Sequence, residues 1–356
     1  MPTSSQTQNS KYLVLAQQLR DQIARKVFRP GDRLPTFVEM RRQHGVTITT
    51  VERAYALLEK ENLVVREQGR GTFVKAHEER PLRNVIGISG LLLPLHPYSM
   101  QLMNGFQQVA NEADVELLLL NENNKIQWEK VDGVINCDTG FVKHEGWRQL
   151  PPGMPCVTTL VEARDFVSVI GNEYQGAYDL VQHLFALGHR RIASLYDPYL
   201  SVRLDGYHAA MRDAGIEVEA NWGRNIACRM SPDLQYTSAS YSVMRRWLAE
   251  DWRETGCTAL VVQNDDTALG AIRAFHEAGW KIPDDVSIAG FDGTEFGRYF
   301  QPQITSVEVP LCEIGATAME QLLRQVKGEA VQPSTIVLPT RVLKGGTTGR
   351  PSSVVI

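Results

Sequence analysis

The sequence lacks the patterns that most enzymes, metalloproteins and membrane proteins need. No apolar stretch approaches the ~20 residues of a membrane-spanning helix, and the leucine run at 117–120 predicts only a strand of a core. The five cysteines include no CxxC pair, which favours buried free thiols over a disulfide framework or a zinc site. Ser-His-Asp spacing, a Walker loop and a GxGxxG motif are missing. The histidines at 96, 183, 189, 208 and 276 lie too far apart, with too few acids or cysteines at ligand spacing, for a metal site. We therefore expect no enzymatic activity, no cofactor and no metal centre.

Length and charge distribution indicate domains of different character. At 356 residues the chain is long enough for two or three domains. Residues 1–80 hold 14 Lys or Arg against nine Asp or Glu, whereas the rest of the chain holds 23 against 32. Neutralising phosphates needs only local positive charge, so the excess of Lys and Arg favours nucleic-acid binding by the N-terminal part of the chain, which we call the head. The alternative is that this excess is a chance fluctuation. The polar first ten residues carry no signal peptide, so we expect a cytoplasmic protein.

Turn and cap signals divide the head into three helices. Apolar residues at a spacing of four predict a helix over 11–26, which ends before Pro30-Gly31. Thr36 caps a second, short helix, and Gly45 supplies the left-handed residue that follows it. Thr47 caps a third helix, whose core-facing residues are Val51, Ala54, Tyr55 and Leu58.

A basic, glycine-rich hairpin follows these helices. Short β runs at 63–65 and 72–74 are joined by Gly69-Arg70-Gly71, a tip without bulk near the backbone. The hairpin completes a winged helix-turn-helix over residues 1–75. Its order places a helix N-terminus beside a basic wing, as a duplex groove and its phosphates require.

The head resembles the GntR family of bacterial regulators over about 65 residues. The family pattern combines P-G-x-x-L-P-[ST], G-V-[ST]-x-x-T-V, A-x-x-x-L-E and G-x-G-T-[FY]-V. The matching residues are Tyr12, Pro30, Gly31, Leu34, Pro35, Thr36, Gly45, Val46, Thr47, Thr50, Val51, Ala54, Leu58, Glu59, Gly69, Gly71, Thr72, Phe73 and Val74. The resemblance implies that this domain binds double-stranded operator DNA.

Three positions depart from the family pattern. Val38, Ile48 and Glu52 stand where relatives usually carry arginines, whose planar fork matches guanine or phosphate. The absence of these arginines implies that the protein recognises its operator by different contacts, such as apolar contacts from Ile48 or Val38 to thymine methyl groups. For Arg41 and Arg42 a solvated surface charge is the alternative to DNA contact. The candidates for phosphates and base edges are Arg33, Thr36, Arg41, Arg42, Thr47, Thr49, Thr50, Arg53, Gln68, Gly69, Arg70 and Gly71.

The body, residues 84–346, alternates strands with helical patterns. Residues 76–83 are polar and charged and predict a linker, and 347–356 predict a C-terminal tail. Alternation of this kind predicts an α/β fold with parallel sheets and a ligand at the carboxyl ends of the strands. Between the strand at 116–120 and the one at 133–135 too few residues remain for a helical crossover. We therefore expect the part of the body that contains these two strands, its first lobe, to lack a helix on one face. This absence affects the geometry of the ligand cleft and of a dimer interface.

Several short sequence motifs of the body resemble the effector domain of the LacI/GalR family, which is similar to periplasmic sugar-binding proteins. They keep their order across some 260 residues and include L-G-H-R-R-I-A at 187–193, N-D-D-T-A-L-G at 264–270 and I-P-D-D-V-S-I-A-G-F-D at 282–292. The resemblance implies two lobes around a cleft, with three crossings of the chain. We expect these crossings near Arg190, Thr305 and Pro333.

The same resemblance points to the residues that contact the effector. A sugar presents hydroxyls and an apolar ring face, so its site needs carboxylate, amide, guanidinium and aromatic groups. Helix capping is the alternative role for Asn264, and capping from a turn is the alternative for Asp292. The candidate ligand-binding residues are Tyr98, Ser99, Asp138, Asn172, Arg203, Asn264 and Asp292.

Together, head and body predict an effector-responsive transcription regulator. The combination is similar in architecture to arabinose-responsive repressors, which implies a homodimer on operator DNA that a small sugar releases. A sugar-transport binding protein would share the body but needs an export signal and no winged head. A fusion of this head to an aminotransferase-like enzyme needs a pyridoxal-phosphate lysine and a longer body. A non-exported sugar-binding module, a non-sugar ligand and recruitment instead of release remain open.

Overall fold

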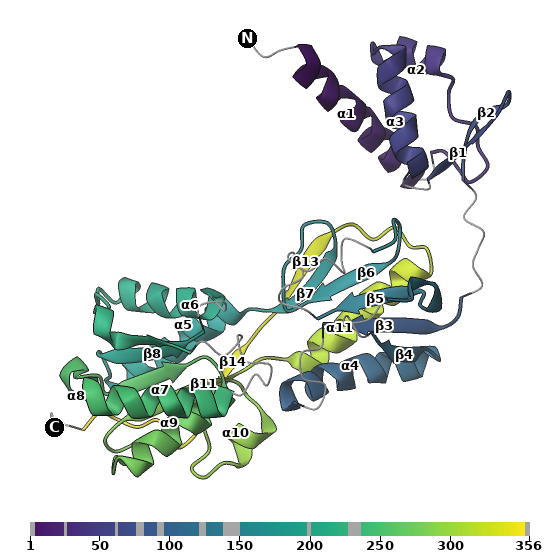
Figure 1. The fold of residues 1–356 in the computed structure, drawn as a ribbon. Helices are drawn as coiled ribbons and strands as arrows, with labels where there is room; N and C mark the ends of the chain where they lie inside the picture. The colour runs from purple at the N-terminus through teal and green to yellow at the C-terminus, as the bar shows by residue number, and fades with distance from the viewer. Residues whose placement is uncertain are drawn as a thin grey trace.

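The computed structural model consists of a small N-terminal domain, the head, and two α/β lobes, the body (Figure 1). It describes residues 4–24, 27–60, 63–75, 82–90, 96–120, 126–137, 150–197, 201–226 and 236–352. Asp138, one of the predicted ligand-binding residues, lies outside these ranges. The mixed α/β class and the division into a helical head and a two-sheet body confirm the predicted fold class.

The head has the predicted helices and wing, although the first helix begins at Ser4 and not at residue 11. Its helices are α1 (Ser4–Ala24), α2 (Phe37–His44) and α3 (Ile48–Lys60), and its hairpin pairs β1 (Val64–Glu67) with β2 (Gly71–Val74) in antiparallel fashion. Thr36 and Glu39 form a reciprocal capping box at the start of α2, with an N···O distance of 2.7 Å from the Thr36 amide to Glu39 Oε2. Gly45 has a φ of 60°, the left-handed conformation expected after the helix.

The core of the head lies between α1, α3 and the hairpin. The Tyr55 ring is fully buried, and its hydroxyl donates to the Pro35 carbonyl over 2.7 Å, so the turn before α2 is tied to α3. Phe37 packs edge-on against this ring, with centroids 5.3 Å apart. These contacts hold α2 and α3 in a fixed relation beside the wing. The buried apolar residues include Leu15, Leu19, Leu34, Met40, Val51, Ala54, Leu58, Val64 and Val74.

The first lobe is built on a parallel sheet of order β13-β7-β6-β5-β3-β4. Its strands are β3 (Val85–Ser89), β4 (Glu116–Leu119), β5 (Gly133–Asn136), β6 (Cys156–Thr159), β7 (Val167–Gly171) and β13 (Ser334–Leu338). Helices α4 (Pro97–Ala113) and α11 (Leu311–Val326) pack tightly on each other. A Cβ added at Gly105 would lie 2.0 Å from the Cys312 carbonyl oxygen, so these helices meet at backbone distance.

The connection from β4 to β5 is short, as predicted. Among its described residues the only helical element is η1 (Trp128–Lys130), a single 3-10 turn. By contrast, the connection from β3 to β4 contains the whole of α4.

The second lobe contains the order β14-β12-β11-β10-β8-β9, with β14 antiparallel and the other strands parallel. Its strands are β8 (Ile192–Tyr196), β9 (Gly223–Asn225), β10 (Ala259–Val262), β11 (Ser287–Asp292), β12 (Thr305–Glu308) and β14 (Arg341–Leu343). Helices α5 (Glu173–Leu187) and α6 (Ser201–Asp213) pack together, and α7 (Tyr236–Glu250) packs on α9 (Asp265–Glu277). Figure 1 shows these pairs on opposite faces of the sheet. The short elements are η3 (Ala220–Trp222), α8 (Trp252–Thr255) and α10 (Glu295–Tyr299).

The chain crosses between the lobes at positions that differ from the expected ones. It leaves the first lobe after β7, near Asn172, because α5 packs on α6, β12 and β14 of the second lobe. The expected crossing near Arg190 was therefore wrong. The second crossing follows β12 and lies close to the one expected near Thr305. The third follows β13 near Thr340, so Pro333, which precedes β13, lies within the first lobe.

The described part of the C-terminal segment packs into the second lobe. Thr347 is fully buried; its carbonyl accepts from the Ile288 amide over 2.8 Å, and its hydroxyl donates to the Ile288 carbonyl over 2.7 Å. The imidazole of His189 lies between Thr258 Oγ1, at 2.8 Å, and the Gly349 carbonyl, at 2.9 Å. His189 thus joins the turn before β8 to this segment, so its role is structural. None of the helices in the described ranges is long and apolar enough to span a membrane.

Candidate interlobe and nucleic-acid sites

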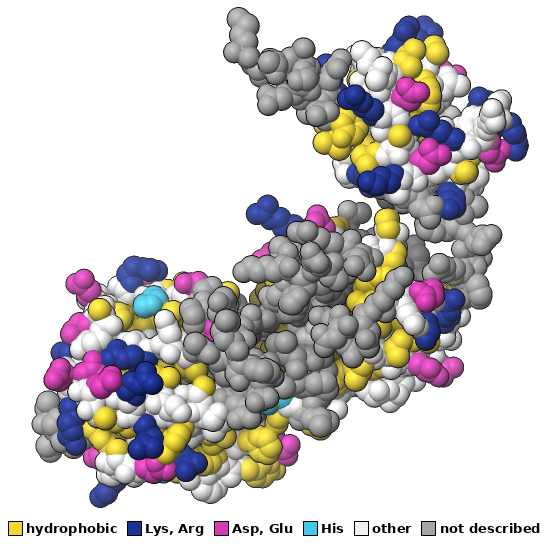
Figure 2. All heavy atoms as spheres, in the orientation of Figure 1, with side chains coloured by type: hydrophobic (Ala, Val, Ile, Leu, Met, Phe, Trp, Pro, Cys, Tyr) yellow, Lys and Arg dark blue, Asp and Glu magenta, His cyan; other side chains and the backbone are white. Residues whose placement is uncertain are grey.

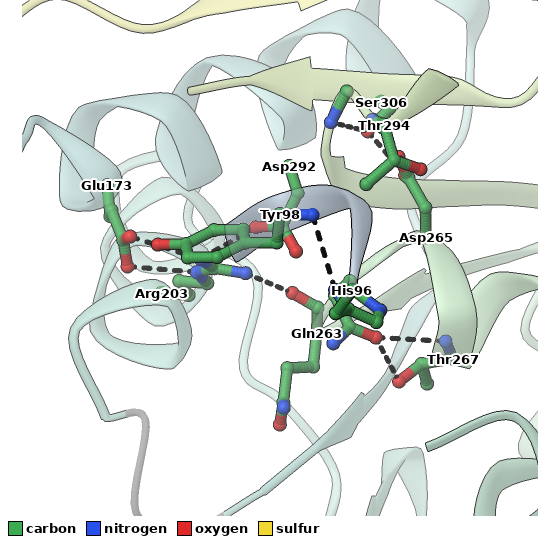
Figure 3. A network of polar contacts seen from close by, with 12 residues as sticks. His96, Tyr98, Glu173, Arg203, Gln263, Asp265, Thr267, Asp292, Thr294 and Ser306 are labelled. Carbon is green, nitrogen blue, oxygen red and sulfur yellow. Dashed lines mark hydrogen bonds and ion pairs between the residues drawn. The ribbon is translucent and has the colours of Figure 1, made fainter. Parts of the chain in front are cut away.

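The guanidinium of Arg203 is the centre of a buried polar cluster at strand ends of the second lobe (Figure 3). Its Nε and Nη2 donate to the two carboxylate oxygens of Glu173 over 2.9 and 3.0 Å, a bidentate pair. Nη1 donates to the backbone carbonyl of Gln263 over 2.6 Å, and Nη2 lies 2.9 Å from Asp292 Oδ1. The Phe291 ring covers one face, with its centroid 4.0 Å from the guanidinium carbon. Arg203 is only 4% exposed.

Burial and charge act in opposite directions on this cluster. Burial by itself would lower the pKa of Arg203, but the carboxylates of Asp292 and Glu173 outweigh it and raise the pKa well above the usual value. Burial raises the pKa of Asp292 to about 6, although the nearby Arg203 cation opposes that rise. Both groups are therefore charged near pH 7, and the cluster is an ion-pair network.

Asp292 has two features that set it apart from an ordinary turn residue. Its φ is 92°, a conformation that a non-glycine residue adopts only at a cost of about 1–3 kcal/mol. Its Oδ1 is buried and lacks a well-aligned hydrogen bond, although it lies within ion-pair distance of Arg203. The side chain that caps α10 belongs to Thr294, which accepts from the Gly297 amide over 3.3 Å. The capping alternative for Asp292 was therefore wrong.

Asp265 holds the turn after Asp292 in place. Its carboxylate accepts from the Thr294 amide over 2.6 Å, from the Thr294 hydroxyl over 2.9 Å and from the Ser306 hydroxyl over 2.6 Å. Burial raises the pKa of Asp265 to about 7, with the Asp292 charge as a second cause. A fully buried carboxyl thus fixes the backbone that carries Asp292.

The other predicted ligand residues divide into three groups. Asn264 caps α9: its Oδ1 accepts from the Thr267 amide over 2.9 Å and from the Thr267 hydroxyl over 2.6 Å, which confirms its helix-capping alternative. Asn172 caps α5 through the Gln175 amide at 3.2 Å. Tyr98 lies beside Arg203 and Glu173 in this cluster (Figure 3), and burial, with the charges of Glu173 and Asp292, raises its pKa well above the usual value. Ser99 is buried in α4 of the first lobe.

Three charged residues of this cluster were missed in the sequence. Glu173 directly follows Asn172 in the sequence, yet its pairing with Arg203, 30 residues later, has no local signal. His96 caps α4, with Pro97 at the first helical position, and its Nε2 lies 2.5 Å from Asp266 Oδ2. The side-chain hydrogen bond to Asp266 raises the pKa of His96, and burial opposes the rise. We call His96, Tyr98, Glu173, Arg203, Asp266 and Asp292 the interlobe cluster.

The interlobe cluster takes side chains from both lobes. His96, the N-cap of α4, and Tyr98, within α4, come from the first lobe, whereas the other members belong to elements of the second. Figure 3 shows the Tyr98 ring beside Arg203 and Glu173, with the His96 imidazole close by. A change in the relation of the lobes therefore changes these contacts. Within the described ranges, no three His, Cys, Asp or Glu side chains come together as metal ligands would.

The head exposes most of the predicted DNA-contacting residues. Arg33, Arg41, Arg42, Arg53 and Arg70 are all exposed, and Figure 2 shows Lys and Arg side chains spread over the head. Gln68 and Gly69 at the wing tip, and Thr36, Thr47 and Thr49 at helix starts, are exposed as well, while Gly71 is half-buried beneath the Arg33 side chain.

Thr50 differs from the other predicted DNA-contacting residues. It is only 5% exposed, and its hydroxyl lies 2.8 Å from that of Thr47. Its amide also donates to Thr47 Oγ1 over 3.2 Å, so this pair fixes the first turn of α3. The side chain of Thr50 therefore supports the helix start from inside the domain.

Comparison with known proteins accounts for both parts of the chain. Residues 11–74 match the bacterial regulatory proteins of the gntR family, and residues 181–348 match a periplasmic binding protein-like domain. The arabinose metabolism transcriptional repressor of Geobacillus stearothermophilus is 27% identical over 363 residues, which cover 95% of this chain and 97% of that protein. Catabolite control protein A of Priestia megaterium is 31% identical over 256 residues, which cover 70% of this chain and 72% of that protein.

Solved structures agree with this assignment at the level of the fold. A LacI family transcriptional regulator from Enterococcus faecium, solved with bound ribose, has a TM-score of 0.64 at 23% identity, over 75% of this chain and 99% of that chain. The fold and these similarities thus define a DNA-binding transcription regulator with a periplasmic-binding-protein-like body. The chain belongs to the LacI family of regulators through that body, and its DNA-binding domain is of the GntR type.

Proposed function

We propose that this protein is a repressor of carbohydrate-utilisation genes, released from its operator when a small sugar-like ligand binds at the interlobe cluster. The observation that carries the proposal is that the cluster joins side chains of both lobes around a buried Arg203, while three chain crossings connect the lobes. A ligand that contacts both sides favours one relation of the lobes over others, and only such a difference in affinity shifts an equilibrium.

The regulatory consequence follows from a homodimer of bodies that presents two heads. Each α3 would enter the major groove of one half-site, and half-sites would lie about one helical turn, ~34–36 Å, or a multiple of it apart. A coupling of ~1–3 kcal/mol between lobe closure and head spacing weakens operator binding about 5–150-fold. The similarity over nearly the full length to a protein named as an arabinose metabolism repressor supports a carbohydrate as the effector. The protein would act as a regulator in the cytoplasm and not as an enzyme.

The test starts from an operator selected from random DNA with the full-length protein. Operator affinity is measured by fluorescence anisotropy with and without a panel of pentoses, hexoses and disaccharides. We expect one sugar to weaken operator binding, and the operator to weaken binding of that sugar by the same factor, because linkage is reciprocal. Analytical ultracentrifugation should give a dimer that binds one operator.

Two variants localise the effect. Asp292→Asn should abolish the response to the sugar and leave operator affinity without sugar unchanged, whereas Asp284→Asn, at an exposed position, should behave as wild type. If no ligand of the panel changes operator affinity, the protein is a DNA binder without a sugar effector, and the proposed function fails.

A further inference from the structure

Each of the three guanidinium nitrogens of Arg203 is already in contact with a group of the protein itself. A guanidinium has five N–H donors, and acceptors of this chain lie within 3.0 Å of all three nitrogens. Glu173 takes the fork-shaped edge formed by Nε and Nη2, which is one of the two edges on which a guanidinium binds a carboxylate or phosphate in bidentate fashion. The Phe291 ring covers one face. The Nε–Nη2 edge of Arg203 is therefore already taken, and an anion that uses this edge must displace Glu173.

The charges of the described cluster sum to a negative value. Glu173 and Asp292 each bring one negative charge against the single positive charge of Arg203. His96 and Asp266 form a separate pair that is neutral in sum when the imidazole is protonated. A ligand at this position thus meets an excess of carboxylate. A like charge placed next to it within a half-buried site is repelled, which lowers affinity on the order of tenfold or more.

Hydroxyl groups suit the same surroundings. The buried Asp292 Oδ1 lacks an aligned donor, and an alcohol O–H supplies one. Glu173 is the more accessible carboxylate of the pair, with 21% of its side chain exposed, and a carboxylate accepts more hydrogen bonds than the two that Arg203 donates. The half-buried ring of Tyr98 adds an apolar surface beside these acceptors.

We propose that the interlobe cluster takes an uncharged, hydroxyl-rich ligand and rejects phosphorylated and carboxylated sugars, and that Glu173 sets this selectivity by occupying the fork of Arg203. The proposal rests on the proposed function, since it specifies the effector of that site. It makes Glu173 a specificity-determining residue, at a position where an uncharged side chain would leave Arg203 free to bind an anion.

The test compares matched ligands and a simple anion on the full-length protein. The ligand pairs are ribose with ribose 5-phosphate, glucose with glucose 6-phosphate, and galactose with galacturonate, measured by calorimetry at constant ionic strength. Inorganic phosphate is the anion probe, measured by its effect on the thermal unfolding midpoint. The variants are Glu173→Gln, which keeps the shape and removes the charge, and Glu173→Ala, which frees the fork. Glu254→Gln, at an exposed position of α8, is the matched control.

We expect the wild type and Glu254→Gln to bind the neutral member of a pair at least about tenfold more tightly, and to show no stabilisation by phosphate. Both Glu173 variants should show a smaller preference for the neutral sugar over its charged counterpart. Glu173→Ala should in addition be stabilised by phosphate. A wild type that prefers the charged sugar, or that phosphate stabilises, overturns the proposal, as does a Glu173→Ala variant that folds but gains no response to phosphate. If no sugar binds at all, the proposed function fails, while the phosphate measurements still decide the role of Glu173.

Discussion

His96 Nε2 lies 2.5 Å from Asp266 Oδ2, and this contact joins the start of α4 in the first lobe to the first turn of α9 in the second. The two residues are 170 positions apart in the sequence. His96 Nδ1 also lies 3.3 Å from the Tyr98 amide nitrogen, so the contact is connected to the helix that carries Tyr98. The contact is mostly shielded from solvent, with about a quarter of the His96 side chain exposed.

Removing this ion pair should reduce stability in a pH-dependent way. The hydrogen bond to Asp266 raises the pKa of His96 above its ordinary value of about 6.5. Its contribution is therefore fully present below pH ~6.5 and is lost as the pH rises through the raised pKa. We expect His96→Asn to lower the free energy of unfolding by about 1 kcal/mol at pH 6, and by less at pH 9.

Urea unfolding of the wild type and the variant between pH 5.5 and 9 measures this difference. His276→Asn, at an exposed position of the same helix as Asp266, is the control for loss of an imidazole. A difference between wild type and His96→Asn that grows with pH would contradict the prediction.

The buried carboxyl of Asp265 should destabilise the protein as the pH rises. Its pKa is about 7 in the folded protein and about 3.9 in an unfolded chain, so the unfolded chain binds fewer protons between these values. The free energy of unfolding should then fall by on the order of 1 kcal/mol per pH unit between pH ~4 and ~7 through this group. Asp265→Asn should remove that part of the decline, because an amide oxygen still accepts from Thr294 and Ser306 can accept from the amide nitrogen.

Urea titrations at pH 4.5, 5.5, 6.5 and 7.5 report the slope. Asp284→Asn, which removes an exposed carboxyl, should keep the wild-type slope. Identical slopes for Asp265→Asn and the wild type would show that burial does not raise the pKa of this carboxyl.

The contact of α4 with α11 should tolerate no side chain at Gly105. An added Cβ would lie 2.0 Å from the Cys312 carbonyl oxygen and 2.7 Å from the Ala316 amide nitrogen, and backbone atoms of a packed helix cannot move aside. We expect Gly105→Ala to lower the free energy of unfolding by about 1–3 kcal/mol despite the better helix propensity of alanine. Asn104→Ala, at the neighbouring exposed position, should be neutral or stabilising. Equal stabilities of the two variants in thermal unfolding would refute the close contact.

The exposed aliphatic side chains of the head should read thymine methyl groups. Ile48 in the first turn of α3 is 40% exposed, and Val38 in α2 is 60% exposed. Replacing a contacted thymine by uracil removes only the methyl group, which is worth about 0.8 kcal/mol when buried, so wild-type affinity should fall a few-fold. Ile48→Ala should bind the thymine operator more weakly and respond no further to uracil at that position.

Anisotropy titrations with operators substituted one thymine at a time test this prediction. Leu13→Ala, which shortens an exposed aliphatic side chain on α1, should respond to uracil as the wild type does. A wild type that is insensitive to uracil at every thymine would exclude methyl recognition by both Ile48 and Val38.

Much of the local structure could be read from the sequence, because its signals act over a few residues. The capping box of Thr36 and Glu39, the left-handed Gly45 and the short hairpin all follow from side-chain and backbone preferences within one turn. Arg203 and Asp292, which lie at the centre of the interlobe cluster, could be predicted because the sequence motifs around them match a family. The short 122–130 connection likewise followed from length alone.

The pairings within the site depended on the packing of whole elements. The sequence by itself determined that a winged head precedes a two-lobed α/β body and that Arg203, Asn264 and Asp292 stand at strand and helix ends. Only the tertiary structure decided that α5 packs on the second lobe, which brings Glu173 to Arg203, and that His96 meets Asp266. The physical reason is that caps and turns are settled by neighbours in the chain, whereas an amphipathic helix buries its apolar face equally well on either sheet. Long-range packing decides which sheet the helix covers, and it thereby also decides the charge of the site.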